Sequence, residues 1–220
     1  MSILFVLLTF IVIITVNYFR VRESGALPIS PFVPVRAPAP VMTKEHGFSI
    51  PRGYCFHPGH TWVARESRED VRVGLDGFTA DVVGKIDELE IVGPNRWVRQ
   101  GQRLMTLKAD GVSLDLLSPV EGVVMAVNPE VVKDPMLALR DPYKDGWVAL
   151  LRAPDLSTNQ KNLMQQSMVA PWMHYSLSRL NAALPKNPAF AQDGGVPVHG
   201  VLLKLEPELR QKLIKDFFLN

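Results

Sequence analysis

This sequence has little cysteine, a small net charge and no glycine-rich nucleotide-binding motif. Its 220 residues include a single cysteine, Cys55, which excludes an internal disulfide and fits a reducing compartment. The formal net charge is +2 and the basic residues are scattered, so we expect no nucleic acid partner. No serine or cysteine has a recognisable nucleophile motif, and no glycine-rich phosphate loop follows a predicted strand. We therefore predict that the protein is not an enzyme.

The first 22 residues contain the longest apolar run. Ile3–Phe19 would reach about 25 Å as a helix, which predicts a single-pass transmembrane anchor in the lipid bilayer. A cleaved signal peptide is the alternative, although no basic residue precedes the run and no small-residue cleavage pattern follows it. Arg20 and Arg22 follow the run directly. The positive-inside rule then places the rest of the chain on the cytoplasmic side of an inner membrane.

Proline, with 18 residues, is plentiful and concentrated after the anchor. We treat residues 23–53 as a proline-rich linker, and Ala26–Pro51 within it should be extended. Apolar residues such as Phe32 and Val35 are more than a solvated tether needs. We expect them to pack on a partner protein, with a free tether as the alternative.

Residues 54–155 carry short β-rich runs at close spacing, which predicts a mainly β sandwich or barrel. One short helix is expected within Leu75–Val83 and another within Pro129–Leu139. The expected strands are Thr61–Ala64, Val71–Leu75, Leu89–Val92, Arg103–Lys108, Ser113–Leu117, Val123–Val127 and Trp147–Leu151.

A hairpin stands at the centre of this region. Leu104–Ala109 and Val112–Leu117 are apolar-rich runs separated by Asp110-Gly111. Asp-Gly readily supplies the two positive φ angles of a tight type I′ turn. A second turn follows at Ser118–Gly122, because Pro119 cannot donate to a ladder and Gly122 tolerates a bend.

The residues around this hairpin resemble a known family. Ser118-Pro-Val-Glu-Gly-Val-Val-Met-Ala-Val-Asn128 is similar to lipoyl and biotinyl domains, in which a carrier lysine sits on an exposed hairpin turn. Further motifs narrow the resemblance to the H protein of the glycine cleavage system, which implies a barrel-sandwich hybrid fold over residues 54–155. These motifs are Phe56-His-Pro-Gly-His-Thr-Trp-Val63, Val73-Gly-Leu75, Gly84-Lys-Ile86 and Asp141-Pro-Tyr-Lys-Asp-Gly-Trp147.

The chain departs from this pattern at the turn. In the family the modified lysine lies seven positions before the serine of the Ser-Pro-Val turn, and the same count from Ser118 leads to Gly111. Lys108 stands where H proteins usually carry a glutamate. It is the only lysine nearby in the sequence and lies on the first strand of the hairpin. Lys108 is therefore either a lipoylation site or a strand lysine that is only solvated. We predict no bound cofactor.

Cys55, His57 and His60 are residue types that can hold a metal. A structural site needs four ligands, and no second pair follows at suitable spacing, so we expect no metal. The resemblance instead implies that the two histidines lead into a strand that buries Trp62.

Residues 156–220 form a helical extension beyond the resemblance. Ser157–Val169 and Trp172–Leu184 have helical spacing, and a proline-rich and glycine-rich loop follows. Pro207–Leu219 carries an apolar stripe that includes Leu213, Phe217 and Phe218. We expect this stripe to dock on a protein partner or a membrane surface.

Two functions fit these observations. Our main prediction is a non-catalytic, non-lipoylated accessory subunit that docks on and stabilises other subunits of a membrane protein complex. A photosynthetic reaction-centre or respiratory assembly is the class of complex we expect. The alternative is a lipoyl carrier protein, modified at Lys108, that serves a membrane-bound redox enzyme.

Overall fold

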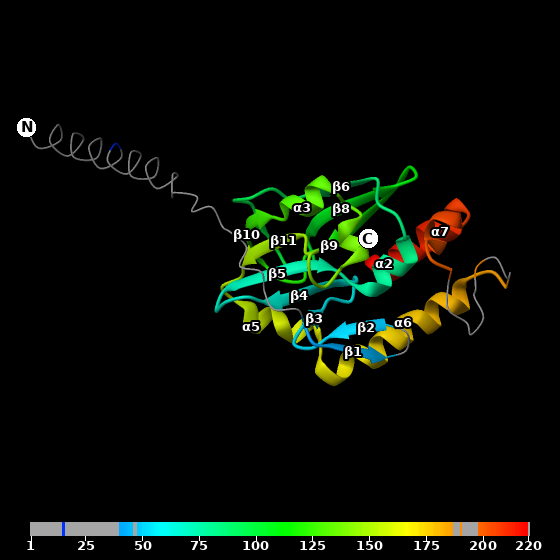
Figure 1. Cartoon of the computed structure of the whole chain (residues 1–220), viewed down its shortest axis with the longest axis horizontal. Coiled ribbons are helices and arrows are strands. Elements are labelled where there is room, and N and C mark those ends of the chain that lie inside the picture. The colour runs from blue at the N-terminus through cyan, green and yellow to red at the C-terminus, as the bar shows by residue number, and fades with distance from the viewer. Residues whose placement is uncertain (1–14, 16–39, 46–47, 187–189, 191–197, 220) are drawn as a thin grey trace, which may run out of the picture. The chain divides into compact units, whose positions relative to one another are not determined.

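Antiparallel sheets form the framework of the domain that follows the linker (Figure 1). The structure is a computed structural model that describes residues 15, 40–45, 48–186, 190 and 198–219. Within these residues, one sheet has the order β12-β3-β4-β5-β11-β10-β7, a second β6-β8-β9, and a third pairs β1 with β2. The strands are β1 Met42–Glu45, β2 Phe48–Pro51, β3 Cys55–Phe56, β4 Thr61–Arg65, β5 Asp70–Leu75, β6 Glu88–Ile91, β7 Trp97–Val98, β8 Arg103–Ala109, β9 Val112–Leu117, β10 Gly122–Val127, β11 Ala149–Arg152 and β12 Met164–Gln165.

Strands β4 and β5 lie near the middle of the largest sheet, around a buried indole. Trp62 on β4 is fully buried, and its Nε1 donates to the carbonyl oxygen of Pro142 at 3.1 Å. Gly74 is the register partner of Trp62 on β5. A Cβ at Gly74 would lie 2.5 Å from the indole ring, so only glycine fits there. The predicted burial of Trp62 and the mainly β architecture are confirmed.

The helices of the β-rich region are short. α2 (Gly77–Val83) agrees with the predicted helix within Leu75–Val83, and Asp76 caps it. The helix predicted within Pro129–Leu139 is instead two helices, α3 (Pro129–Lys133) and α4 (Leu137–Arg140). The break falls at Asp134 and Pro135, because proline disfavours helical angles in the residue before it and lacks an N–H to continue the ladder.

The C-terminal extension differs in part from the prediction. A continuous helix over Ser157–Val169 is wrong: α5 (Leu156–Asn159) ends early, and 3₁₀ turns at Gln160–Asn162 and Gln166–Met168 flank β12. Strand β12 pairs with β3, and these tertiary backbone hydrogen bonds override the local helical pattern. The two later helices are confirmed as α6 (Val169–Ala183) and α7 (Pro207–Phe218), with a 3₁₀ turn at Val201–Lys204 between them.

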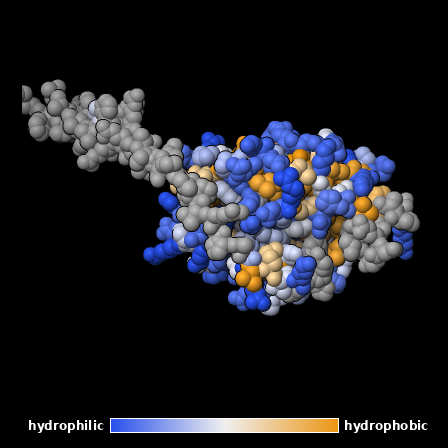
Figure 2. Space-filling model, in the orientation of Figure 1, coloured by the Kyte–Doolittle hydropathy of each residue, from blue (hydrophilic) through white to orange (hydrophobic). Residues whose placement is uncertain are grey.

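Helix α7 packs on the chain's own β-rich domain. Leu213, Phe217 and Phe218 are buried, and α7 contacts β9. The Phe217 ring lies 5.4 Å from that of Phe78 on α2, and Figure 1 shows the two helices beside each other. The face in Figure 2 shows hydrophobic areas between larger hydrophilic ones. The apolar stripe expected to dock on a protein partner or a membrane surface is instead buried against the chain's own domain.

The N-terminal predictions fall largely on residues that the structure leaves undescribed. Ile3–Phe19, apart from Thr15, lies outside the described residues, as do Phe32 and Val35. None of the helices in the described residues is long and apolar enough to cross a membrane. At the end of the predicted extended linker, β1 and β2 form a hairpin, and β2 buries Ile50 beside α2 and α6. This part of the linker is folded because the domain covers it.

Candidate functional site

The Asp110-Gly111 turn protrudes from the three-stranded sheet. Ala109 pairs with Val112, so the loop has two residues, and φ is 47° at Asp110 and 75° at Gly111. Both φ angles are positive, as a type I′ turn requires, and the predicted hairpin is confirmed. A Cβ at Gly111 would have no atom within 4 Å. The turn is therefore an open tip to which a large side chain or another protein has free access.

Lys108 lies on the central strand of this sheet, two residues before the tip. It pairs with Glu88 on β6 and Ser113 on β9. Its Nζ donates to Glu90 Oε1 and lies 3.3 Å from Glu88 Oε2. The hydrogen bonds to Glu90 and then Glu88 raise the pKa of Lys108. The amine thus lies in water but is held by two carboxylates of the neighbouring strand.

A second lysine at the tip, Lys85, was missed by the sequence analysis. Its Nζ lies 2.6 Å from Asp110 Oδ1 and 3.0 Å from Asp87 Oδ1. The backbone N–H of Asp110 donates to Asp87 Oδ2 at 2.8 Å, so the loop and the turn are joined. The hydrogen bonds to Asp110 and Asp87 raise the pKa of Lys85. The sequence contained one signal for Lys85. A glycine after an apolar run, here Gly84, is typical of a helix C-cap, and the residue that follows a C-cap commonly lies at the surface.

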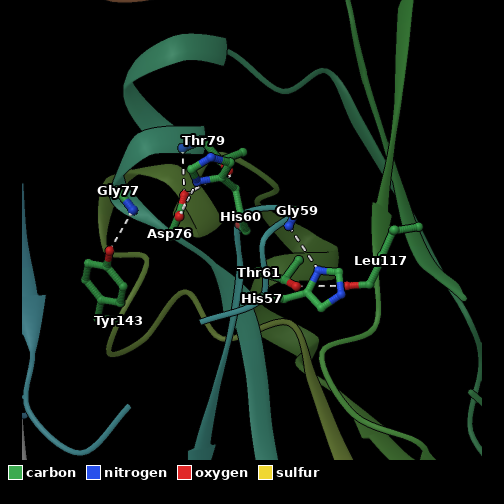
Figure 3. Close-up of polar contacts among 9 residues, drawn as sticks. All are labelled: His57, Gly59, His60, Thr61, Asp76, Gly77, Thr79, Leu117 and Tyr143. Atoms are coloured by element: carbon green, nitrogen blue, oxygen red, sulfur yellow. Dashed lines mark hydrogen bonds and ion pairs between the residues drawn. The ribbon is translucent and has the colours of Figure 1, made fainter. Parts of the chain in front are cut away.

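The histidine segment forms a separate, buried cluster (Figure 3). His60 Nδ1 lies 2.7 Å from Asp76 Oδ2, while Asp76 Oδ1 accepts from the Thr79 N–H at 2.8 Å. The imidazole stacks with the rings of Phe78 and Trp172, at centroid distances of 4.1 and 4.7 Å. The polar contacts of this pair join the segment before β4 to the start of α2, and the ring contact with Trp172 adds α6, which indicates a structural role.

His57 and Cys55 are also committed to packing. His57 Nδ1 accepts from the Gly59 N–H at 3.0 Å, and burial lowers the pKa of this imidazole to about 4. Burial raises the pKa of the Cys55 thiol. In the part of the chain that the structure describes, no three histidine, cysteine or acidic side chains gather as a metal site.

A mainly β domain that presents an exposed two-residue hairpin resembles the carrier class of lipoyl and biotinyl domains. The glycine cleavage H-protein family matches residues 54–174, and the chain belongs to this family. It is 29% identical to a glycine cleavage system H protein of Magnetococcus marinus over 125 residues, which are 57% of this chain and 88% of that relative. A Legionella pneumophila protein of the same name is 34% identical over 97 residues, or 44% and 77% of the two chains.

A solved structure with the same description is also similar. The H protein of Mycobacterium marinum matches with a TM-score of 0.44 and 24% identity. The match covers 47% of this chain and 86% of that one.

These relatives contradict our main functional prediction. Proteins named glycine cleavage system H protein match most of their own length to this chain. A non-lipoylated accessory subunit is therefore the wrong conclusion, and the finding favours the alternative, a lipoyl carrier. The prediction failed because the glycine found at position 111 was given more weight than the family to which the whole domain belongs.

Of the residues expected to bind a partner, Leu213, Phe217 and Phe218 face the interior of the domain. Lys108 and Gly111 lie at the exposed end of the three-stranded sheet, where Lys85 joins them. This end of the sheet is consequently the candidate functional site.

Proposed function

We propose that the protein is a lipoyl carrier of the H-protein type, with the group in amide linkage to a lysine at the tip of the β6-β8-β9 sheet. The observation that carries this proposal is the open Asp110-Gly111 turn, with the Lys85 amine 2.6 Å from the Asp110 carboxylate and Lys108 two residues before the turn on β8. Membership of the glycine cleavage H-protein family supports it. The protein itself would catalyse no reaction and would present the group to enzymes that do.

The geometry suits a carrier because the base of the arm is rigid while the lysine amines are in water. Strand β8 is paired on both sides, and the hairpin has a fixed two-residue turn. A long side chain on such a base sweeps a defined volume outside the domain. An enzyme that binds the sheet would then have the carried group within reach of its active site. The tether raises the effective concentration of that group at the active site.

We further propose that Ile3–Phe19 attaches the carrier to a membrane, with the domain on the cytoplasmic side. The length of the apolar run and the two arginines that follow it support this arrangement. The enzyme served would be a membrane-bound redox enzyme. Protease added to sealed, right-side-out cells should leave the domain intact; its digestion from outside would contradict this topology.

The carrier function is tested by modification of the full-length protein. The purified chain is incubated with lipoic acid, ATP and a lipoate–protein ligase, and its intact mass is measured. We expect the mass to rise by one lipoyl group. The matched control is Gly111→Lys, which places a lysine on the turn itself. If Gly111→Lys accepts the group and the unaltered protein does not, the carrier function is refuted.

A further inference from the structure

Lys85 is the lysine that contacts the turn itself. It lies in the loop between α2 and β6, 25 residues before Asp110 in the sequence, yet its Nζ is 2.6 Å from the Asp110 carboxylate. The Lys85 side chain is 49% exposed. Its amine therefore stands at the open tip, close to the position that the missing turn lysine would occupy.

Both neighbours of Lys85 are anchored. Gly84 ends α2 in the left-handed conformation, and its N–H donates to the Ala80 carbonyl at 3.0 Å. Ile86 is buried, and the N–H of Asp87 donates to the Lys108 carbonyl at 2.9 Å. Lys85 is thus an exposed residue on a short loop whose two ends are tied to a helix and to strand β8. Such a loop gives an attached arm a rigid base.

Lys108 is less accessible in comparison. It stands on the central strand, with a paired strand on each side, and its side chain is 36% exposed. Glu88 and Glu90 project from the adjacent strand and hold its amine. Lys85 is also held by two carboxylates, so position distinguishes the two lysines. A modifying enzyme meets Lys108 on the face of a paired sheet and Lys85 on a short loop beside an open turn.

We propose that Lys85, rather than Lys108, is the lysine that receives the carried group. This inference rests on the proposed carrier function and names the attachment site for it. The loop between α2 and β6 would then replace the hairpin turn as the base of the arm, with Asp110 as a positioning residue.

The attachment forms one amide bond without oxidation or reduction. Neutral Lys85 Nζ attacks the carbonyl carbon of a lipoyl adenylate, which the ligase makes from lipoate and ATP with release of pyrophosphate. The carbon–oxygen bond to AMP breaks, and AMP leaves with the electron pair. The proton lost by the amine passes to water. Because Asp110 and Asp87 raise the pKa of Lys85, we expect attachment to become faster as the pH rises.

The experiment compares Lys85→Arg with the matched variant Lys108→Arg in the full-length protein. Each keeps the positive charge and the ion pairs, so the circular dichroism spectrum should not change. Both are incubated with lipoic acid, ATP and a lipoate–protein ligase, and the modified residue is located by peptide fragmentation. We expect Lys85→Arg to abolish the gain of a lipoyl group and Lys108→Arg to leave it complete.

A variant of the positioning residue sharpens the test. Asp110→Asn can retain the positive φ of the turn but removes one carboxylate from Lys85. Its pH profile of attachment should shift to lower pH, whereas a purely structural role of Asp110 would leave the profile in place.

The outcomes separate the two proposals. Modification that survives Lys85→Arg, or is lost in Lys108→Arg, overturns the assignment of Lys85 while the carrier function stands. Absence of modification in the unaltered protein, with Gly111→Lys modified, refutes the carrier function itself.

Discussion

The tip of the three-stranded sheet and the cluster around His60 use the same kinds of residues in opposite surroundings. At the tip, Lys85 and Asp110 form an ion pair in water, each side chain about half exposed. Around His60, the imidazole and Asp76 are both at most 1% exposed and lie among aromatic rings. A charged side chain at the tip keeps its hydration and loses little free energy, whereas a charged side chain in the cluster loses its hydration and must be compensated by hydrogen bonds.

This difference separates stability from function within one domain. Ring contacts of His60, directly before β4, hold α2, α6 and α7 together, so changes there should destabilise the fold. Side chains at the tip contribute little packing and remain available to another molecule. The comparison leads to four predictions on the free energy of unfolding, from the largest effect to the smallest.

Truncating Phe218 should have the largest effect. Its ring is buried beside His60, and replacing a buried phenylalanine with alanine costs about 3–5 kcal/mol. The matched control is Leu219→Ala at the next, exposed position, where we expect a change within about 0.5 kcal/mol. Urea unfolding of both full-length variants measures the difference. Equal effects would mean that α7 is not part of the core.

Acid should weaken the buried cluster through His57. The pKa of His57 is about 4 in the folded chain and 6.5 when unperturbed, so the unfolded chain binds the proton more readily. This contribution is complete above pH 6.5 and is lost as the pH falls towards 4, by about 3 kcal/mol. His57→Gln should remove that part of the pH dependence. A variant with an unchanged slope between these pH values would disprove the assignment.

Two glycines of the same conformation test packing in the two regions. Gly84 and Gly111 have φ of 73° and 75°, so alanine at either should cost about 1 kcal/mol from backbone strain. A Cβ at Gly84 would also lie 2.6 Å from the Gly200 backbone, whereas Gly111 has open space. We expect Gly84→Ala to cost about 1–2 kcal/mol more than Gly111→Ala in urea unfolding. Equal losses of unfolding free energy in the two variants would show that the backbone at Gly200 moves aside without strain.

Removing the ion pairs of Lys108 should have the smallest effect. Its contacts with Glu88 and Glu90 are exposed to water and screened by salt. Lys108→Gln should leave the urea midpoint unchanged within error, at low and at high salt. A clear loss of stability at low salt would place this ion pair among the structural contacts of the domain.

Elements with a strong local signal were predicted well. The Asp110-Gly111 turn, strands β4, β5 and β8 to β10, and helices α6 and α7 follow from residue type and spacing over a few positions. Strand β12 was missed because its extended form depends on pairing with β3, about a hundred residues earlier. Local pattern contains no information on such a partner.

The site was predicted only in part. Lys108 and Gly111 were singled out because they adjoin the turn in sequence. Lys85 was overlooked because it reaches the turn only when α2 ends at Gly84 and β6 pairs with β8. Helix α7 was expected to face a partner, since its amphipathic pattern specifies a buried face without naming what buries it.

By itself, the sequence determined the hairpin turn, most strands and the amphipathic character of α7, because each depends on backbone preferences and side-chain periodicity within a short segment. Only the tertiary structure decided that α7 covers the chain's own domain and that Lys85 meets Asp110. Both outcomes depend on the packing of segments far apart along the chain, where the burial of apolar rings and the pairing of strands outweigh local preference.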